Sequence, residues 1–455
     1  MNFDIINPAT GAKVRSYPAM TDAEAARVVD QAAEAQERWT NVSFAERARL
    51  MHKAGDVLRE RAEEFAKLMA EEMGKPLAGG VAEVNKCAWV CDYYADNAES
   101  QLAPEPVETG AHKSFVCYEP LGVVLAVMPW NYPYWQVFRF AAPTLMAGNA
   151  GVLKHAANVV GCALSIESVF KQAGFPENLF RTLVISSGQT AAIIRHPKVR
   201  AVSLTGSVGA GKAVAAEAGA VLKKCVLELG GSDAYVVLED ADLDVAAKAC
   251  VAGRFVNSGQ SCIAAKRFIV VDKVRKAFEQ KVLELSRQQK MGDPMQKGVT
   301  VGPMARADLR DELHQQVEES VSKGAKCVLG GEVPAGPGAF YPPTVLTEVH
   351  PGMPAYSDEM FGPVAAIIAA KDEADAVRIA NDSVFGLGGA VFTRDLKRGE
   401  RLAARELHSG AVFVNQQLKS DPRMPFGGIK ESGYGRELGP YGIREFVNIK
   451  SVSIA

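Results

Sequence analysis

Short apolar runs that alternate with helical segments begin near residue 121 and largely decide what this chain can fold into. The first four runs lie at 123–127, at a segment ending with 152–153, at 182–185 and at 201–204. Runs of this length, bounded by turn residues, are typical of strands buried on both faces of a parallel sheet. Helical segments at 158–173 and 189–195 separate them. This β–α–β series predicts a doubly wound α/β sheet.

A second series of the same kind begins after residue 228. Its strand-like and helical segments follow one another at 234–238, 242–253, 267–271 and 274–288. A single hydrophobic core stops growing at roughly 250 to 300 residues, so a chain of this length is expected to divide into domains. We therefore predict two doubly wound α/β domains, the second of which spans 228–430.

One segment interrupts this pattern before the first sheet. Pro104 and Pro106 end a largely helical N-terminal part, and 114–118 is rich in β-forming residues. The end of the chain, 425–455, is Gly-rich and then β-like. We predict that 102–120 forms a short β-ribbon that stands off the body of the protein.

Charge and cysteine usage exclude several classes of protein. The net charge is −2 at pH 7, so the chain lacks the basic field that attracts nucleic acids or anionic membranes. It contains no run of about 18 apolar residues and no secretion-signal pattern, so we expect a cytoplasmic protein with no nucleic-acid or membrane partner. The eight cysteines show no Cys-x-x-Cys spacing, so neither a metal site nor a disulfide framework is expected.

Three short stretches carry side chains suited to chemistry at a carbonyl carbon. Cys262 follows the small and polar run 257–261, which keeps a thiol approachable. Glu228 is followed by one leucine and then by two glycines. The Asn131 amide lies in a stretch bounded by two prolines. A thiol nucleophile, a carboxylate base and an amide donor to an oxyanion are the parts of thioester chemistry. Nothing in the sequence alone brings the three together.

These three stretches resemble motifs of the aldehyde dehydrogenase superfamily. Two further matches, at 359–364 and 425–433, complete five motifs in the family's order, and the resemblance covers nearly the whole chain. It implies three parts: a Rossmann-like cofactor-binding domain formed by 1–101 and 121–227, a catalytic thiol domain formed by 228–430, and an oligomerisation ribbon and tail formed by 102–120 and 431–455.

The resemblance also implies a mechanism. Cys262 adds to the aldehyde, and the oxyanion is held by the Asn131 amide and the backbone N–H of Cys262. Hydride transfer to the nicotinamide then leaves a thioester. Glu228 activates the water that hydrolyses this thioester to the acid. The presence of Glu228 favours hydrolysis over transfer of the acyl group to coenzyme A.

The usual Gly-x-Gly-x-x-Gly fingerprint of dinucleotide binding is absent after the first strand. Gly206 and Ser207 instead mark a junction where a strand ends and a helix begins, with Gly211 on the first turn of that helix. By themselves these residues fit an ordinary turn. They also resemble the family's Phe-Thr-Gly-Ser-x-x-x-Gly motif, which implies that all three bind the phosphates of a nicotinamide cofactor at a helix N-terminus.

The resemblance adds four cofactor-binding residues: Trp130, Lys154, Glu359 and Phe361. Lys154 is expected at the adenine ribose and Glu359 at the nicotinamide ribose. The family's second ribose ligand, a glutamate, is replaced here by Ala157. That carboxylate would repel the 2′-phosphate of NADP, so the cofactor is expected to be NAD or NADP. His155 is either an ordinary surface histidine, which we favour, or a residue near the 2′ position.

Arg139 and Ser420 are the candidate substrate residues. A helix starting near 133 would give 135, 138 and 139 a shared face toward the aldehyde, and a guanidinium among aromatics suits a substrate carboxylate. The alternative is an arginine that covers its neighbours or pairs with an acid. Succinate-semialdehyde dehydrogenases carry an arginine at this position and a serine that Ser420 matches. Many also carry a second arginine where this chain has Val256.

The resemblance therefore favours oxidation of a short carboxylated aldehyde, most simply succinate semialdehyde, with NAD or NADP. The alternatives within enzymes are a broad aliphatic aldehyde dehydrogenase, a glutarate-semialdehyde type, or an esterase that uses the same thiol. The alternative from another class is an inactive structural relative. The expected partners are the small aldehyde and further copies of the chain, in a dimer or tetramer.

Overall fold

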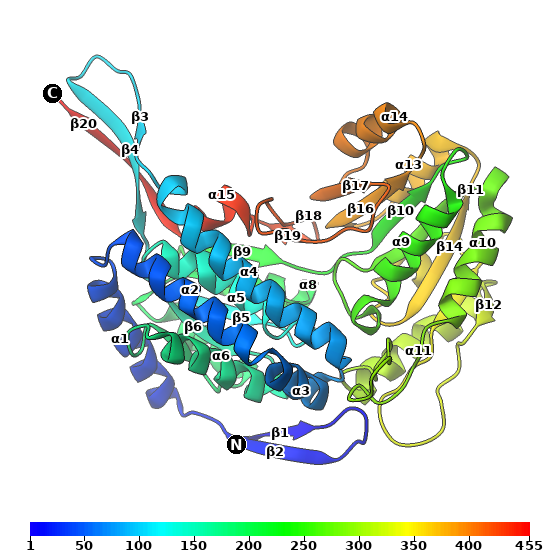
Figure 1. Ribbon diagram of the computed structural model, residues 1–455, viewed down its shortest axis with the longest axis horizontal. Coiled ribbons are helices and arrows are strands. Elements are labelled where there is room, and N and C mark those ends of the chain that lie inside the picture. The colour runs from blue at the N-terminus through cyan, green and yellow to red at the C-terminus, as the bar shows by residue number, and fades with distance from the viewer.

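The structure is a computed structural model that describes residues 1–455. It begins with a two-stranded hairpin, β1 (Asn2–Ile6) and β2 (Lys13–Pro18). Four helices follow: α1 (Asp22–Trp39), α2 (Phe44–Glu60), α3 (Ala62–Met73) and α4 (Leu77–Gln101). Thr21 and Glu24 form a reciprocal capping box that defines the start of α1. Helices α2, α3 and α4 pack side by side, whereas α1 lies apart from them and packs directly on the first sheet (Figure 1).

The first sheet has six strands in the order β19-β9-β8-β5-β6-β7. Its strands are β5 (Val123–Met128), β6 (Ala150–His155), β7 (Phe180–Thr182), β8 (Val199–Thr205), β9 (Lys224–Glu228) and β19 (Gly433–Tyr434). The helices between them are α5 (Trp135–Met146), α6 (Val160–Ala173), α7 (Thr190–Arg195) and α8 (Val208–Ala220). All pairs are parallel except β19 with β9. The predicted doubly wound sheet is confirmed.

One strand lies earlier than the sequence predicts. The apolar run 182–185 was expected as the third strand, but β7 occupies Phe180–Thr182. Leu183 still donates its N–H to Leu153 O at 2.8 Å, whereas Val184 O accepts from Met20 N, also at 2.8 Å. The run leaves the sheet because its next backbone partner is the N-terminal segment. Apolar content marked it as buried without revealing which backbone it would pair with.

The second sheet has seven strands in the order β12-β13-β14-β11-β10-β16-β17. They are β10 (Asp233–Val237), β11 (Ala265–Val271), β12 (Lys326–Leu329), β13 (Thr344–Thr347), β14 (Val364–Ala370), β16 (Gly388–Phe392) and β17 (Ala411–Val414). Its main helices are α9 (Leu243–Phe255), α10 (Asp272–Arg287), α11 (Ala307–Ser322), α13 (Glu373–Asn381) and α14 (Leu396–Arg401). Only β12 runs antiparallel. The second predicted α/β unit is therefore also confirmed.

Alternate residues of β10 enter different cores on the two faces of this sheet. Val236 packs in the cluster with Met304 and Met360, whereas Tyr235 packs in the cluster with Phe278. Because side chains alternate across a strand, both faces of the sheet must be covered. This explains why its strands read as continuous apolar runs.

A three-stranded ribbon projects from the end of the molecule farthest from the second sheet (Figure 1). It consists of β3 (Glu105–Pro106), β4 (Lys113–Pro120) and β20 (Val447–Ile454), with β4 in the centre. β4 and β20 pair antiparallel along their whole length, from Val447 opposite Pro120 to Ile454 opposite Lys113. The ribbon is as the sequence predicts, while the exact domain boundaries remain a prediction. None of the helices is both long and apolar enough to span a membrane.

Candidate active site

Cys262 lies in a tight loop between the short 3-10 turn η3 (Val256–Gly259) and β11. Asn257 and Ser258 both adopt left-handed backbone conformations, with φ of 53° and 55°. A side chain at Gly259 would collide with the Gly362 carbonyl. Non-glycine residues rarely hold such angles unless the surroundings impose them, and they concentrate at functional sites. The loop is therefore held in one conformation.

Two buried side chains stabilise this loop by donating hydrogen bonds to backbone carbonyls. Arg254 is fully buried and its Nη2 donates to the carbonyls of Gly259 at 2.6 Å and Gly362 at 2.8 Å. Lys266 donates from Nζ to the carbonyls of Ser261 at 2.7 Å and Cys262 at 2.6 Å. Sequence reasoning missed Lys266. The signal was a charged pair, Lys-Arg, inside an otherwise apolar strand.

Cys262 stands where two cavities meet. The larger cavity has a volume of about 570 Å³ and is bordered by Trp135, Arg139 and Phe426 among others. The smaller cavity has a volume of about 390 Å³ and is bordered by an almost entirely different set of residues. Only Cys262 and Gln136 line both. A thiol in this position is reachable from two sides, so one ligand on each side could meet at its sulfur.

The predicted oxyanion donor, Asn131, lines the smaller cavity. Its Nδ2 donates to Gln260 O at 3.2 Å, and its Oδ1 accepts from Gln136 Nε2 at 3.1 Å. These two bonds orient the amide so that its N–H₂ group faces the segment that carries Cys262. Asn257 Nδ2 donates to the Asn131 carbonyl at 2.7 Å and so ties the two loops together.

The predicted base, Glu228, ends β9 and is almost completely buried. Neither carboxylate oxygen has a hydrogen-bond partner. Burial raises the pKa of Glu228 well above its usual value, while the nearby Arg139 guanidinium opposes this. Burial therefore disfavours the ionised carboxylate at this position. Glu228 borders neither of the two cavities, so it lies behind the surface that carries Cys262.

The thiol itself is in a surrounding that disfavours its anion. Burial raises the pKa of Cys262 to about 12, and the Lys266 and Arg139 charges act in the opposite direction. The sequence indicated an approachable thiol, and the cavities agree with this. Burial nevertheless means that the thiolate needs further stabilisation when the site is used.

The smaller cavity contains most of the predicted cofactor residues. The rings of Trp130 and Phe361 meet edge to face at a centroid distance of 5.7 Å on its wall. Gly206 and Ser207 also line it, and the Ser207 hydroxyl accepts from Ala210 N at 3.3 Å, capping α8. Glu359 accepts from Gly231 N at 3.0 Å.

Two predicted cofactor residues lie outside this cavity. A Cβ at Gly211 would meet the Leu229 side chain at 2.6 Å, so this glycine allows helix α8 to approach its neighbour. Lys154 is half-buried at the end of β6, and burial lowers its pKa. Both assignments remain predictions.

The expectation of a surface position for His155 is wrong. The ring is buried, with Nε2 2.9 Å from the Pro133 carbonyl, and Nδ1 accepts from Ala156 N at 2.9 Å. Burial lowers the pKa of His155 to about 4, so the ring is neutral. Its two nitrogens serve backbone groups, which also leaves neither for a 2′-phosphate. The sequence could not show that a loop from another strand would cover this side chain.

Arg139 and Ser420 both border the larger cavity, as does Trp135, but Phe138 does not and instead stacks on Phe170 in the core. Arg139 is only 2% exposed and forms an ion pair with the buried carboxylate of Glu437. The pairing with an acid, which the sequence left as an alternative, is therefore the arrangement present. Contact of Arg139 with a substrate carboxylate stays a prediction.

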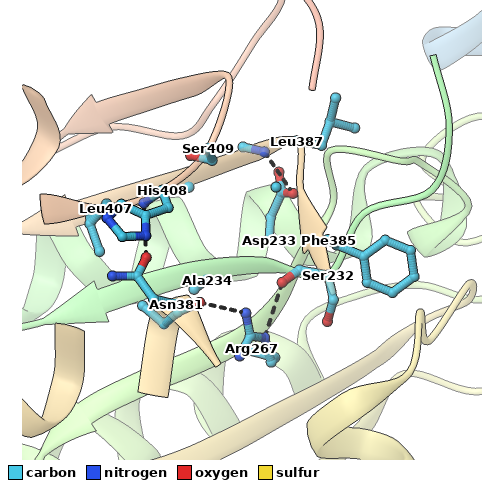
Figure 2. A pocket seen from close by; sticks show the side chains of 14 residues that line it. Ser232, Asp233, Ala234, Arg267, Asn381, Phe385, Leu387, Leu407, His408 and Ser409 are labelled. Carbon is cyan, nitrogen blue, oxygen red and sulfur yellow. Dashed lines mark hydrogen bonds between the residues drawn. The ribbon is translucent and has the colours of Figure 1, made fainter. Parts of the chain in front are cut away.

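A much smaller cavity, of about 20 Å³, lies where the central strands β10 and β16 of the second sheet begin (Figure 2). There Arg267 donates to the carbonyls of Ser232 and Ile379, each at 3.0 Å. Asp233 accepts from Gly388 N at 3.0 Å. These bonds fix the segment that follows Glu228, and this segment supplies the N–H group bound by Glu359. The role of the cluster is to support the site.

The sequence matches the aldehyde dehydrogenase family over residues 1–452. A Synechocystis protein named as a probable NADP⁺-dependent succinate-semialdehyde dehydrogenase is 50% identical over 450 residues, covering 99% of each chain. The Escherichia coli succinate semialdehyde dehydrogenase Sad, which uses NAD(P)⁺, is 48% identical over 447 residues, covering 98% of this chain and 96% of its own. The NADP⁺ complex of the Streptococcus pyogenes succinic semialdehyde dehydrogenase superposes with a TM-score of 0.97 at 37% identity, covering 99% of both chains. This chain belongs to the aldehyde dehydrogenase family.

Proposed function

We propose that this protein oxidises succinate semialdehyde to succinate with NADP⁺ or NAD⁺. The observation that carries the proposal is the position of Cys262 between two cavities, which fits a thiol that receives an aldehyde on one side and a cofactor on the other. The Synechocystis and Escherichia coli relatives, which are named for this aldehyde and for NADP⁺ or NAD(P)⁺, support the choice of aldehyde and cofactor.

The walls of the smaller cavity suit a nicotinamide dinucleotide. The N-terminal turn of α8, with Gly206 and Ser207 at the wall, offers backbone N–H groups and a positive dipole end for phosphates. Trp130 and Phe361 supply aromatic surface, and Glu359 supplies a carboxylate that accepts from ribose hydroxyls. When bound, the cofactor accepts a hydride. Lys154, at the carboxyl end of β6, would hold the adenine ribose.

Cys262 acts as the nucleophile in this proposal. The Cys262 S–H proton leaves to water, and the sulfur then forms a bond to the aldehyde carbon. The carbonyl oxygen that becomes negative accepts hydrogen bonds from Asn131 Nδ2 and from the Cys262 backbone N–H. Asn131 already has its amide oriented by Gln136. Loss of hydride leaves a thioester on Cys262, and attack by water releases the acid.

Glu228 takes the proton from this water. Because it borders neither cavity, its side chain has to turn toward Cys262 for this step. Its carboxylic acid must first ionise, because burial favours the neutral form. The Arg139 and Arg436 charges lower the cost of that ionisation. Glu228 therefore acts as a base whose pKa is raised by burial.

A broad aliphatic aldehyde dehydrogenase is the second candidate. The observation that favours it is the ion pair of Arg139, because a guanidinium already paired with Glu437 would have to leave that carboxylate to bind a substrate. We also propose that copies of the chain assemble into a dimer or tetramer through the exposed ribbon of β4 and β20. The proposed location of the protein is the cytoplasm.

A panel of aldehydes run with each cofactor tests the proposal. Succinate semialdehyde, glutarate semialdehyde, butanal and benzaldehyde would be compared by kcat/KM, following reduced cofactor. We expect succinate semialdehyde to give the highest value. A profile in which butanal matches it would establish the second candidate instead.

A further inference from the structure

Three partly or fully buried cations line the larger cavity, and they differ in their partners. Lys75 forms an ion pair with Glu83, and Arg139 forms one with Glu437. Lys86 forms no ion pair with any carboxylate. Of these three cations, Lys86 is therefore the one with no carboxylate in direct contact.

The groups that do touch Lys86 are neutral. Its Nζ donates to Ser420 Oγ at 2.7 Å and lies 4.1 Å from the centroid of the Trp135 ring. All three side chains line the larger cavity and come from separate parts of the chain, with Lys86 on α4 and Trp135 on α5. Lys419, the remaining cation on this wall, is exposed, so its charge is screened by solvent.

A partly buried ammonium with only a hydroxyl and an aromatic face beside it is an incomplete site. Burial of a charge is costly unless an opposite charge and hydrogen bonds compensate for it. The Ser420 hydroxyl accepts from Lys86, so its own proton remains free to be donated. A carboxylate between the two would accept one hydrogen bond from each.

We propose that Lys86, together with Ser420, which the sequence had already indicated, binds the distal carboxylate of the aldehyde substrate in place of Arg139. This inference rests on the proposed function and deepens it by naming the specificity-determining cation. Lys86 is a specificity residue rather than a catalytic one, because it contacts the far end of the substrate.

Arg139 is poorly suited to the same role. Releasing it from Glu437 to meet a substrate would leave a buried carboxylate unpaired. Lys86 can gain a carboxylate without losing one. Its flexible stem also allows the ammonium to adjust to substrates of slightly different length.

The electrostatic surroundings of Lys86 give the proposal a pH signature. Burial lowers the pKa of Lys86 to about 8, and the Arg139 charge acts in the same direction. The other groups that face it are Cys87 and Glu83 on α4 and Asp421 next to Ser420, all of which act to raise it. Above about pH 8 the free enzyme loses the ammonium, so binding of a carboxylated aldehyde should weaken.

The test compares Lys86→Met and Lys86→Arg with the parent on succinate semialdehyde and on butanal, which has the same chain length and no carboxylate. Lys171→Met, at an exposed position on α6, controls for loss of one positive charge. We expect Lys86→Met to lower kcat/KM for succinate semialdehyde by about ten- to a hundredfold, mainly through KM, and to lower that for butanal by less than about threefold. Lys86→Arg should recover much of the loss.

The pH profile supplies a readout that a merely structural lysine would not move. In the parent, KM for succinate semialdehyde should rise above about pH 8 while KM for butanal stays level. In Lys86→Arg this rise should disappear, because a guanidinium stays charged. An equal loss for both aldehydes in Lys86→Met, or an unchanged KM profile in Lys86→Arg, would overturn the inference.

The parent separates failure of this inference from failure of the proposed function. If the parent itself does not prefer succinate semialdehyde to butanal, the proposed function is wrong. If the parent shows the preference and Lys86→Met keeps it, only the assignment of Lys86 is wrong. Competitive inhibition by succinate, measured with butanal as substrate, gives a second readout and should weaken in Lys86→Met.

Discussion

Arg139 and Glu437 form an ion pair in which the two side chains are only 2% and 5% exposed. The pair joins α5 to the C-terminal segment, beside the predicted base Glu228. A buried pair of this kind adds little net stability, yet removal of one partner leaves an uncompensated charge. Arg139 therefore contributes both to packing and to the charge balance of Glu228.

This arrangement predicts the result of changing Arg139. Arg139→Met should destabilise the protein by about 3–5 kcal/mol and lower turnover of succinate semialdehyde and butanal together. The double variant Arg139→Met/Glu437→Gln should regain much of the stability, because no buried charge is then left alone. Urea unfolding and kinetics with both aldehydes check this. A selective loss for succinate semialdehyde at unchanged stability would instead support substrate contact by Arg139.

Cys262→Ala should abolish aldehyde oxidation. Cofactor binding, measured by quenching of protein fluorescence, should remain nearly intact because many other residues line the smaller cavity. Labelling by iodoacetamide should require alkaline conditions in the absence of cofactor, since burial raises the pKa of this thiol to about 12. Retained turnover above a few per cent would exclude Cys262 as the nucleophile.

Exposed Cys327 offers an internal comparison for the labelling experiment. It should react first in the protein without ligands, and Cys262 should become the more reactive of the two only when the cofactor is bound. Mass spectrometry of the labelled peptides distinguishes the two sites. An order that does not change with cofactor would show that the cofactor does not activate the thiol.

Glu228→Gln should slow thioester hydrolysis while hydride transfer stays fast. A burst of reduced cofactor followed by slow turnover is the expected time course in a stopped-flow experiment. In the parent, hydrolysis should increase with pH through the raised pKa of Glu228, because the ionised form is the base. A steady-state rate equal to that of the parent would point to another base.

Ala157→Glu should shift the cofactor preference from NADP toward NAD. Ala157 is exposed just after β6, so a carboxylate there can be accommodated without disturbing the core. It would repel a 2′-phosphate and accept hydrogen bonds from ribose hydroxyls. KM values for both cofactors decide the question, with Ala157→Gln as the uncharged control. If the glutamine and glutamate variants behave alike, charge at this position does not govern the preference.

Much of the fold was predictable because its signals are local. The apolar runs at 123–127 and 234–238 became β5 and β10 within one residue, since strands buried on both faces need continuous apolar sequence. Ser207 caps α8, as expected for a residue with a hydroxyl directly before a helix. The chemistry around Cys262 was implied by the resemblance of five motifs to the aldehyde dehydrogenase family.

The sequence by itself determined the fold class, the nucleophile candidate and the family. Only the tertiary structure decided which charges are neutralised and which are left open. Glu437 reaches Arg139, and Ser420 reaches Lys86, from distant parts of the chain. His155 is buried because backbone from another strand's loop closes over it. Charge pairing and burial depend on contacts between residues far apart in the sequence. Local residue patterns therefore cannot predict which partner a given side chain will meet.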